Sequence, residues 1–238
     1  MGRAFEYRKA RKMKRWSSMA KAFTRIGREI AIAVKDGGTD PANNPRLRMA
    51  MQNAKAANMP KATVENSIKK ASSKDAEDYS EHVYEGYAPH GIAVIVETAT
   101  NNTNRTVANV RHVFSKYNGN LGTSGSVDYM FNRKGVFKIL SEGIDQEELE
   151  LELIDHGLEE VTVEDDKLVL KCDFVDYGSL HKALEEKNIE VEESELIRIP
   201  THTTKLTDEQ EEEVITLIEK MEEDDDVLNV FHNMDEEV

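Results

Sequence analysis

The sequence predicts an α+β protein of three domains: a basic three-helix domain at the N-terminus, followed by two ferredoxin-like α/β domains, with the third inserted in the second. Three observations predict this fold class. Hydrophobic residues recur at helical spacing in the first 74 residues, apolar strands alternate with amphipathic helices beyond them, and one helix and one strand are left over at the C-terminus. A chain of 238 residues is long enough for two or three compact domains.

The charge of the chain is divided unevenly between its parts. Residues 1–74 hold 18 Lys+Arg against 5 Asp+Glu, a net charge of +13, whereas residues 75–238 hold 13 against 41, a net charge of −28. Such asymmetry indicates nucleic-acid binding by the basic part, while the acidic part keeps the protein soluble. The alternative is that the two parts neutralise each other in the folded molecule, although charges act over a Debye length of only about 8–10 Å.

Three helices are predicted in residues 1–74, after a basic arm formed by residues 1–15. The first runs from Ser18 to Lys35 and places an apolar stripe opposite a cationic outer row. Asn44 followed by Pro45 predicts the cap and first position of the second helix, which Asn58 ends in the left-handed conformation. Pro60 begins the third helix.

A polar segment at 72–81 coincides with the reversal of charge and predicts the first domain boundary. Residues 91–99 then predict a buried central strand, followed by a helix that Asn102 or Thr103 caps and Gly119 ends. Two more strands are predicted at 126–131 and 136–140, with a turn at 132–135 between them.

The inserted domain is predicted to span residues 135–204. Its strand–helix–strand–strand–helix–strand order is that of the ferredoxin-like fold. The elements are a helix capped by Asp145 and ending at Gly157, a hairpin at 161–172 turning at Asp165 and Asp166, a helix around 178–187 and an extended segment at 189–199. A last helix, capped by Thr207 and Gln210, and a strand at 227–233 are expected to return to the earlier sheet. The second domain therefore comprises residues 82–134 plus 205–238.

Six segments, in order along nearly the whole chain, resemble the YebC/PmpR family, which also includes the mitochondrial translational activator of cytochrome c oxidase. They are NPRLR at 44–48, AKAANMPK at 54–61, YEGYAPHG at 84–91, NNTNRTVANVR at 101–111, GNLGTSGSV at 119–127 and DDDVLNVFHN at 224–233. The resemblance departs at residues 2–6. It implies three domains, the third inserted in the second, and a regulator that binds DNA in some members and supports translation on the ribosome in others.

The candidate nucleic-acid-binding residues lie in the basic part and at one later helix start. Cationic side chains neutralise phosphates and release counterions, and few carboxylates stand beside them in this sequence. The predicted contacts are Arg8, Lys9, Arg11, Lys12, Lys14, Arg15, Lys21, Arg25, Arg28, Arg46, Arg48, Asn101 and Arg105. The partner is expected to be DNA or ribosomal RNA, and the ribosome is a possible larger partner.

Four features of the sequence each allow two interpretations. Trp16 could stack on a base or anchor the arm on a core. The segment 100–106 could bind an anion through Asn101 and Arg105 or serve as an ordinary helix cap. The glycine-rich segment 119–126 lacks the lysine of a P-loop and predicts a flexible connection or a nucleic-acid contact. The acidic run 222–226 lacks the ligand spacing of an EF-hand and predicts a solvated turn rather than a Mg²⁺ site.

The sequence argues against an enzyme. The seven histidines are scattered, and neither a nucleophile motif nor a dinucleotide fingerprint is present, so no catalytic residue, cofactor or metal is predicted. The one cysteine, Cys172, closes a predicted strand and is expected to be a small buried residue. The longest strongly apolar stretch, Ile92 to Val96, is too short for a membrane span or signal peptide. These features predict a cytoplasmic protein, expected to be a monomer, that does not bind membranes.

Overall fold

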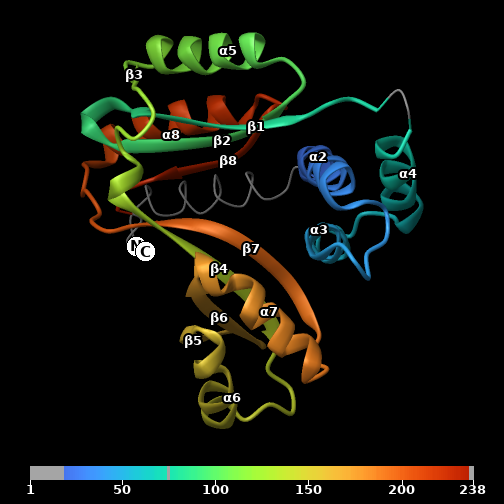
Figure 1. Cartoon of the computed structure of the whole chain (residues 1–238). Coiled ribbons are helices and arrows are strands. Elements are labelled where there is room, and N and C mark those ends of the chain that lie inside the picture. The colour runs from blue at the N-terminus through green and yellow to red at the C-terminus, as the bar shows by residue number, and fades with distance from the viewer. Residues whose placement is uncertain (1–18, 74–75, 236–238) are drawn as a thin grey trace.

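The computed structural model describes residues 19–73 and 76–235. Three helices come first, α2 (Met19–Gly37), α3 (Pro45–Ala56) and α4 (Lys61–Ala71), and we call them the helical region (Figure 1). They share a core that includes Ile30, Leu47 and Val64. The predicted caps are confirmed: the Asn44 side chain accepts from the Leu47 amide at 3.0 Å, and Asn58 has a φ of 56°.

The first sheet contains β1 (Ser80–Tyr87), β2 (Ala93–Thr100), β3 (Asn120–Leu121) and β8 (Val227–His232), in the order β3-β1-β2-β8 with antiparallel neighbours. Helices α5 (Thr103–Lys116) and α8 (Asp208–Glu222) pack on it through one core (Figure 1). The central, buried position of β2 and the return of α8 and β8 to this sheet confirm the predictions. Thr207 and Gln210 form the predicted capping box.

The second sheet contains β4 (Phe131–Leu140), β5 (Leu158–Glu164), β6 (Lys167–Asp173) and β7 (Val191–Pro200), in the order β5-β6-β4-β7, again antiparallel. Helices α6 (Gln146–Leu153) and α7 (Tyr177–Glu186) complete the predicted ferredoxin-like order. The hairpin turns at Asp165, whose φ is 55°, and Asp145 caps α6, as predicted.

Two predictions made from the sequence are wrong. Residues 128–130 form a short 3₁₀ helix rather than a strand. Residues 132–135 continue β4 rather than turn, because all four pair with β7. Gly135 serves close packing instead of a turn: an added Cβ would lie 2.5 Å from the Tyr177 ring and 2.9 Å from Cys172 Sγ. Strand β1 was not predicted, because most of its side chains are polar and at least partly exposed.

The α+β class, the helical N-terminal region and the two antiparallel sheets are confirmed. The ferredoxin-like order applies only to the second sheet. In the first sheet two strands precede α5, and the unit that contains the second sheet lies between β3 and α8. The residue bounds of the three domains remain a prediction.

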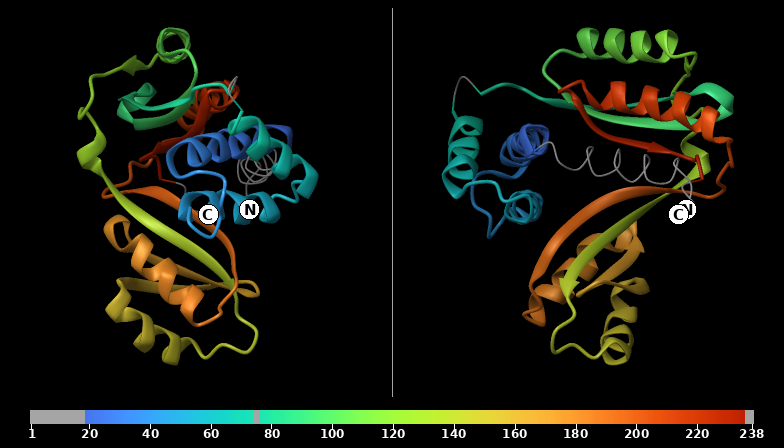
Figure 2. Two further views of the ribbon diagram at one scale, coloured as in Figure 1. Left: turned by 45° about the vertical axis from the view of Figure 1, so that its right-hand side comes forward. Right: turned by 180° about the vertical axis from the view of Figure 1, so that it is seen from behind.

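The helical region lies beside both sheets (Figure 2). Ile32 of α2 packs with Ala99 and Leu228 of the first sheet, and α3 packs along β7 of the second. Among the residues described, no helix has the length and apolar character needed to cross a membrane.

Candidate nucleic-acid interface

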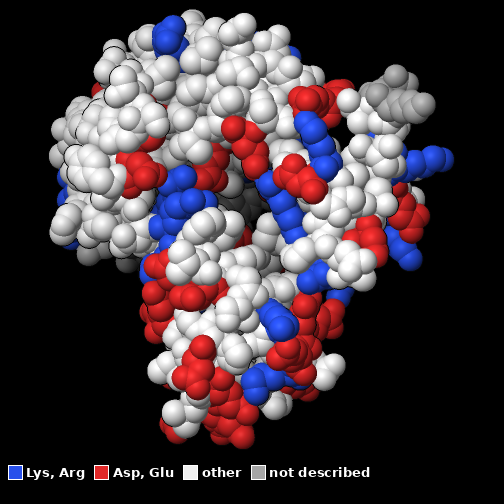
Figure 3. Space-filling model, viewed as in Figure 1, with Lys and Arg blue, Asp and Glu red and all other residues white. Residues whose placement is uncertain are grey.

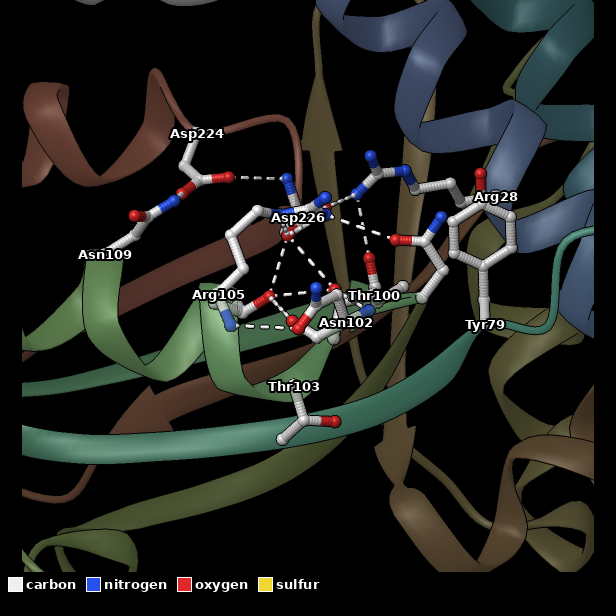
Figure 4. Close-up of polar contacts among 12 residues, drawn as sticks. Arg28, Tyr79, Thr100, Asn102, Thr103, Arg105, Asn109, Asp224 and Asp226 are labelled. Carbon is white, nitrogen blue, oxygen red and sulfur yellow. Dashed lines mark hydrogen bonds and ion pairs between the residues drawn. The ribbon is translucent and has the colours of Figure 1, made fainter.

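Asp226, at the turn between α8 and β8, is the centre of a buried ion-pair network (Figure 4). Its side chain is 2% exposed and accepts from Arg28 Nη1 at 2.8 Å and from Arg105 Nη2 at 2.7 Å. The hydroxyls of Thr106 and Thr100 donate to it at 2.7 and 3.1 Å. Burial alone would raise the pKa of Asp226, but these hydrogen bonds and the charge of Arg28 lower it below the ordinary value. The carboxylate therefore stays ionised and joins the helical region to the first sheet.

Arg28 is not part of an outer cationic row, which corrects the sequence reading of α2. Its side chain is 12% exposed, its guanidinium also donates to the Ala99 carbonyl at 2.8 Å, and it lies over the Tyr79 ring. A guanidinium held on three sides by the protein has little capacity left for a phosphate. Arg28 is a contact between the helical region and the first sheet.

The start of α5 shows the capping arrangement rather than an open anion site. Asn102 caps the helix by accepting from the Arg105 amide at 3.1 Å, and Thr100 Oγ1 accepts from the Asn102 amide at 2.9 Å. Arg105 donates to Asn101 Oδ1 at 3.3 Å as well as to Asp226, and about half of its side chain stays exposed. The carboxylate of Asp226 thus takes the place of an external anion beside Arg105. Phosphate binding by Asn101 and Arg105 stays a prediction.

The other predicted cations of the helical region face carboxylates of the α/β part. Arg46 pairs with Glu81, and Arg48 Nε lies 2.9 Å from Glu185 Oε1. The acidic run is a solvated turn only in part: Glu223 and Asp225 are exposed, but Asp226 is buried. Lys21 and Arg25 line a shallow hollow beside it. Lys21 donates to the Glu222 carbonyl at 3.3 Å.

Further pairs across the same boundary join Lys35 to Asp78, Lys55 to Glu190 and Lys70 to Glu77. On the face shown in Figure 3, Lys and Arg are interspersed with Asp and Glu, and acidic side chains gather over the second sheet at the bottom of the view. The basic and acidic parts of the chain therefore neutralise each other over much of the helical region.

The predicted contacts of the basic arm, Arg8, Lys9, Arg11, Lys12, Lys14 and Arg15, lie outside the described residues, as does Trp16. Their role stays a prediction.

The glycine-rich segment 119–126 is tied to a buried carboxylate that the sequence reading missed. Glu85 of β1 accepts from the amides of Gly125, Val127 and Asp128 at 2.7 to 2.9 Å. Burial favours the neutral acid, but the three amides and Arg198 lower the pKa of Glu85. The segment is therefore held in place by the amide of Gly125 and by two amides that directly follow the segment. Free backbone amides are the groups that a nucleic-acid phosphate would need.

Cys172 is fully buried in the core of the second sheet, as predicted, and burial raises the pKa of its thiol to about 11. Such a thiol is a poor nucleophile at neutral pH. Within residues 19–73 and 76–235, no group of three or more His, Cys, Asp or Glu side chains is arranged to hold a metal ion.

Glu29 on α2 is a partly buried carboxyl whose pKa is raised from 4.5 to about 7. Burial is the main cause; Arg46 and Arg25 oppose it, and Glu81 and Glu195 add to it. The folded protein thus binds a proton at Glu29 that the unfolded chain releases between pH 4.5 and about 7.

The unsubstituted protein should lose stability as pH rises through this window. We expect the Glu29→Gln variant not to show this loss. The free energy of unfolding of the unsubstituted protein should fall by up to about 3 kcal/mol between pH 4.5 and 8 through this group, while the variant keeps that contribution constant. Urea denaturation at pH 5 and pH 8 measures it. Glu65→Gln is the control, since Glu65 is exposed and pairs with Lys61 of its own helix. Equal pH slopes for Glu29→Gln and the control would show the shift to be absent.

Two family models match this chain, and the boundary between them lies between the helical region and the first sheet. The family model described as the TACO1/YebC protein N-terminal domain matches residues 3–74, and the one described as the TACO1/YebC second and third domain matches residues 79–234. The chain belongs to the YebC family. The resemblance seen in the sequence is thereby confirmed.

Relatives of this YebC-family chain are similar over their whole length. One from Flavobacterium johnsoniae is 57% identical over 237 residues and covers 100% of both chains; one from Porphyromonas gingivalis is 56% identical over 238 residues, covering 100% of this chain and 98% of its own. Both are named "Probable transcriptional regulatory protein". The crystal structure of a conserved hypothetical protein from Aquifex aeolicus matches with a TM-score of 0.77 at 38% identity, covering 92% of this chain and 91% of that one.

Proposed function

We propose that this YebC-family protein is a non-enzymatic regulator of gene expression in the cytoplasm that binds DNA mainly through phosphate contacts of its N-terminal part. The observation that carries the proposal is the charge of residues 1–18, which hold seven Lys+Arg and one Glu. Most of the predicted cations within the described residues already have carboxylate partners, so affinity for a polyanion is assigned chiefly to this segment. The relatives' names support a role in regulating transcription.

Ribosomal RNA is the second candidate ligand, and one observation favours it. Helix α3 lies against β7, and Arg28 of α2 is ion-paired inside the protein, so in this arrangement neither helix presents a free basic face to a DNA groove. Phosphate contacts position a protein without reading sequence. Discrimination would then depend on the shape of a folded RNA.

Two assays separate these ligands. Gel shifts compare a promoter duplex with its scrambled sequence, and co-sedimentation through sucrose tests association with ribosomes at physiological salt. DNA binding as a transcription regulator requires a large affinity ratio between the two duplexes and no ribosome association. Equal binding of all duplexes with sedimentation on ribosomes would assign the protein to translation. No binding in either assay would refute the proposal. The monomeric state, also a proposal, is tested by sedimentation velocity.

A further inference from the structure

Helix α3 carries three cations and no carboxylate. Its apolar side chains Leu47, Ala50 and Ala54 face the core of the helical region. Met49 and Asn53, on the opposite side, contact the second sheet and its helix: Tyr177 Oη lies 2.8 Å from Met49 Sδ, and Asn53 Oδ1 accepts from the Ser194 amide at 3.1 Å. The second side of α3 is therefore covered by the α/β part.

Each cation of α3 meets a carboxylate from the α/β part. Arg46 pairs with Glu81 of β1, Arg48 with Glu185 of α7, and Lys55 with Glu190, which directly precedes β7. The hydrogen bond between Lys55 and Glu190 raises the pKa of the lysine and lowers that of the glutamate. The three carboxylates come from separate segments, and each pairs with a cation that a phosphate could also pair with.

At the Lys55 end of α3 this covering is held weakly. Lys55 and Glu190 are 68% and 70% exposed, and exposed ion pairs contribute little to stability. Gln52 Oε1 on α3 and His181 Nε2 on α7 are buried without a hydrogen-bond partner in the described part of the chain. A buried polar atom without a hydrogen bond costs free energy, so neither atom stabilises this arrangement. By contrast, α2 is fixed to the first sheet by an apolar contact and by Arg28 and Asp226.

We infer that α3 is a second phosphate-binding surface, closed in this arrangement by Glu81, Glu185 and Glu190, which a nucleic-acid backbone displaces. The inference rests on the proposed function, because it concerns the same polyanionic ligand. The α/β part then restrains binding: a ligand gains the α3 contacts only when its phosphates outcompete three carboxylates. Helix α3 moves away from α7 and β7, while α2 remains on the first sheet.

The test compares two triple variants with the same change in net charge. The first is Glu81→Gln, Glu185→Gln and Glu190→Gln. The control is Glu152→Gln, Glu159→Gln and Glu160→Gln. These carboxylates pair with Lys187, Lys134 and Lys171, all within the second α/β unit, the part of the chain that forms the second sheet with α6 and α7. The probes are a fluorescent random-sequence DNA duplex and an RNA hairpin of equal length. Each lost ion pair shifts the balance a few-fold, so the first variant should bind at least about tenfold more tightly than the control.

A second measurement follows the opening directly in the unsubstituted protein. Hydrogen exchange of peptides covering residues 185–194 should accelerate when the duplex or hairpin is added, since the Ser194 amide loses Asn53. Adding Arg46→Ala and Lys55→Ala to the first variant should abolish its gain in affinity. Equal affinities of the two triple variants, or unchanged exchange, would overturn the inference while leaving the proposed function intact. Failure of every chain to bind either probe would overturn both.

Discussion

Replacing Asp226 with alanine is expected to lower the free energy of unfolding by about 3–5 kcal/mol. The carboxylate is 2% exposed, and its loss leaves Arg28, itself 12% exposed, as a buried charge without its partner. Breaking a buried pair by removing one member costs this much, because the remaining charge stays desolvated. The hydroxyls of Thr100 and Thr106 also lose their acceptor. Urea denaturation at pH 7 measures the change.

Asp225→Ala is the matched control, because Asp225 is the exposed neighbour in the same turn. Its effect should stay within about 0.5 kcal/mol. Since the pKa of Asp226 is lowered in the folded state, its contribution is present at neutral pH and is lost as pH falls below about 4. Asp226→Ala should therefore differ from the unsubstituted protein less at pH 3 than at pH 7. A loss under 1 kcal/mol at pH 7 would contradict the assigned role of the network.

Neutralising the basic arm should have the largest effect on binding. The quadruple variant Arg8→Ala, Lys9→Ala, Arg11→Ala and Lys12→Ala is expected to weaken binding of a random-sequence duplex by on the order of 10²-fold at 150 mM salt. Four lost phosphate contacts should reduce the slope of log affinity against log salt by about 3.6. Fluorescence anisotropy at a series of salt concentrations measures both quantities.

The matched control removes four cations elsewhere: Lys167→Ala, Lys171→Ala, Lys182→Ala and Lys187→Ala, all in the second α/β unit. The change in net charge is the same, so a difference between the two variants reports local contacts rather than overall charge. Comparable losses would show that binding is a property of net charge, and the assignment of affinity to the arm would be wrong. The Arg28→Ala variant is unsuitable for this purpose, because it removes a partner of Asp226 and therefore perturbs folding.

The boundaries of most helices could be read from the sequence, because a helix cap acts within three or four residues. Asn44, Asn102, Asp145 and Thr207 each accept a hydrogen bond from an amide three residues ahead, and all four were expected at helix starts. The second sheet followed from alternating elements with short connections. Strand β1 could not be predicted from the sequence. Its register depends on β2 and β3, and its own residues have no consistent apolar alternation.

The sequence by itself also determined the family and the uneven charge of the chain. Only the tertiary structure decided which cations remain available, because ion pairs join residues that are remote in sequence. Arg28 meets Asp226 across 198 positions and Arg105 meets it across 121, so neither pair leaves a local signal. Arg28 and Arg105, which the sequence predicts as phosphate ligands, form ion pairs within the protein. The acidic run predicted to be a solvated turn contains the buried residue Asp226. A charged side chain is assigned by what lies within a few ångströms of it, and folding alone brings those groups together.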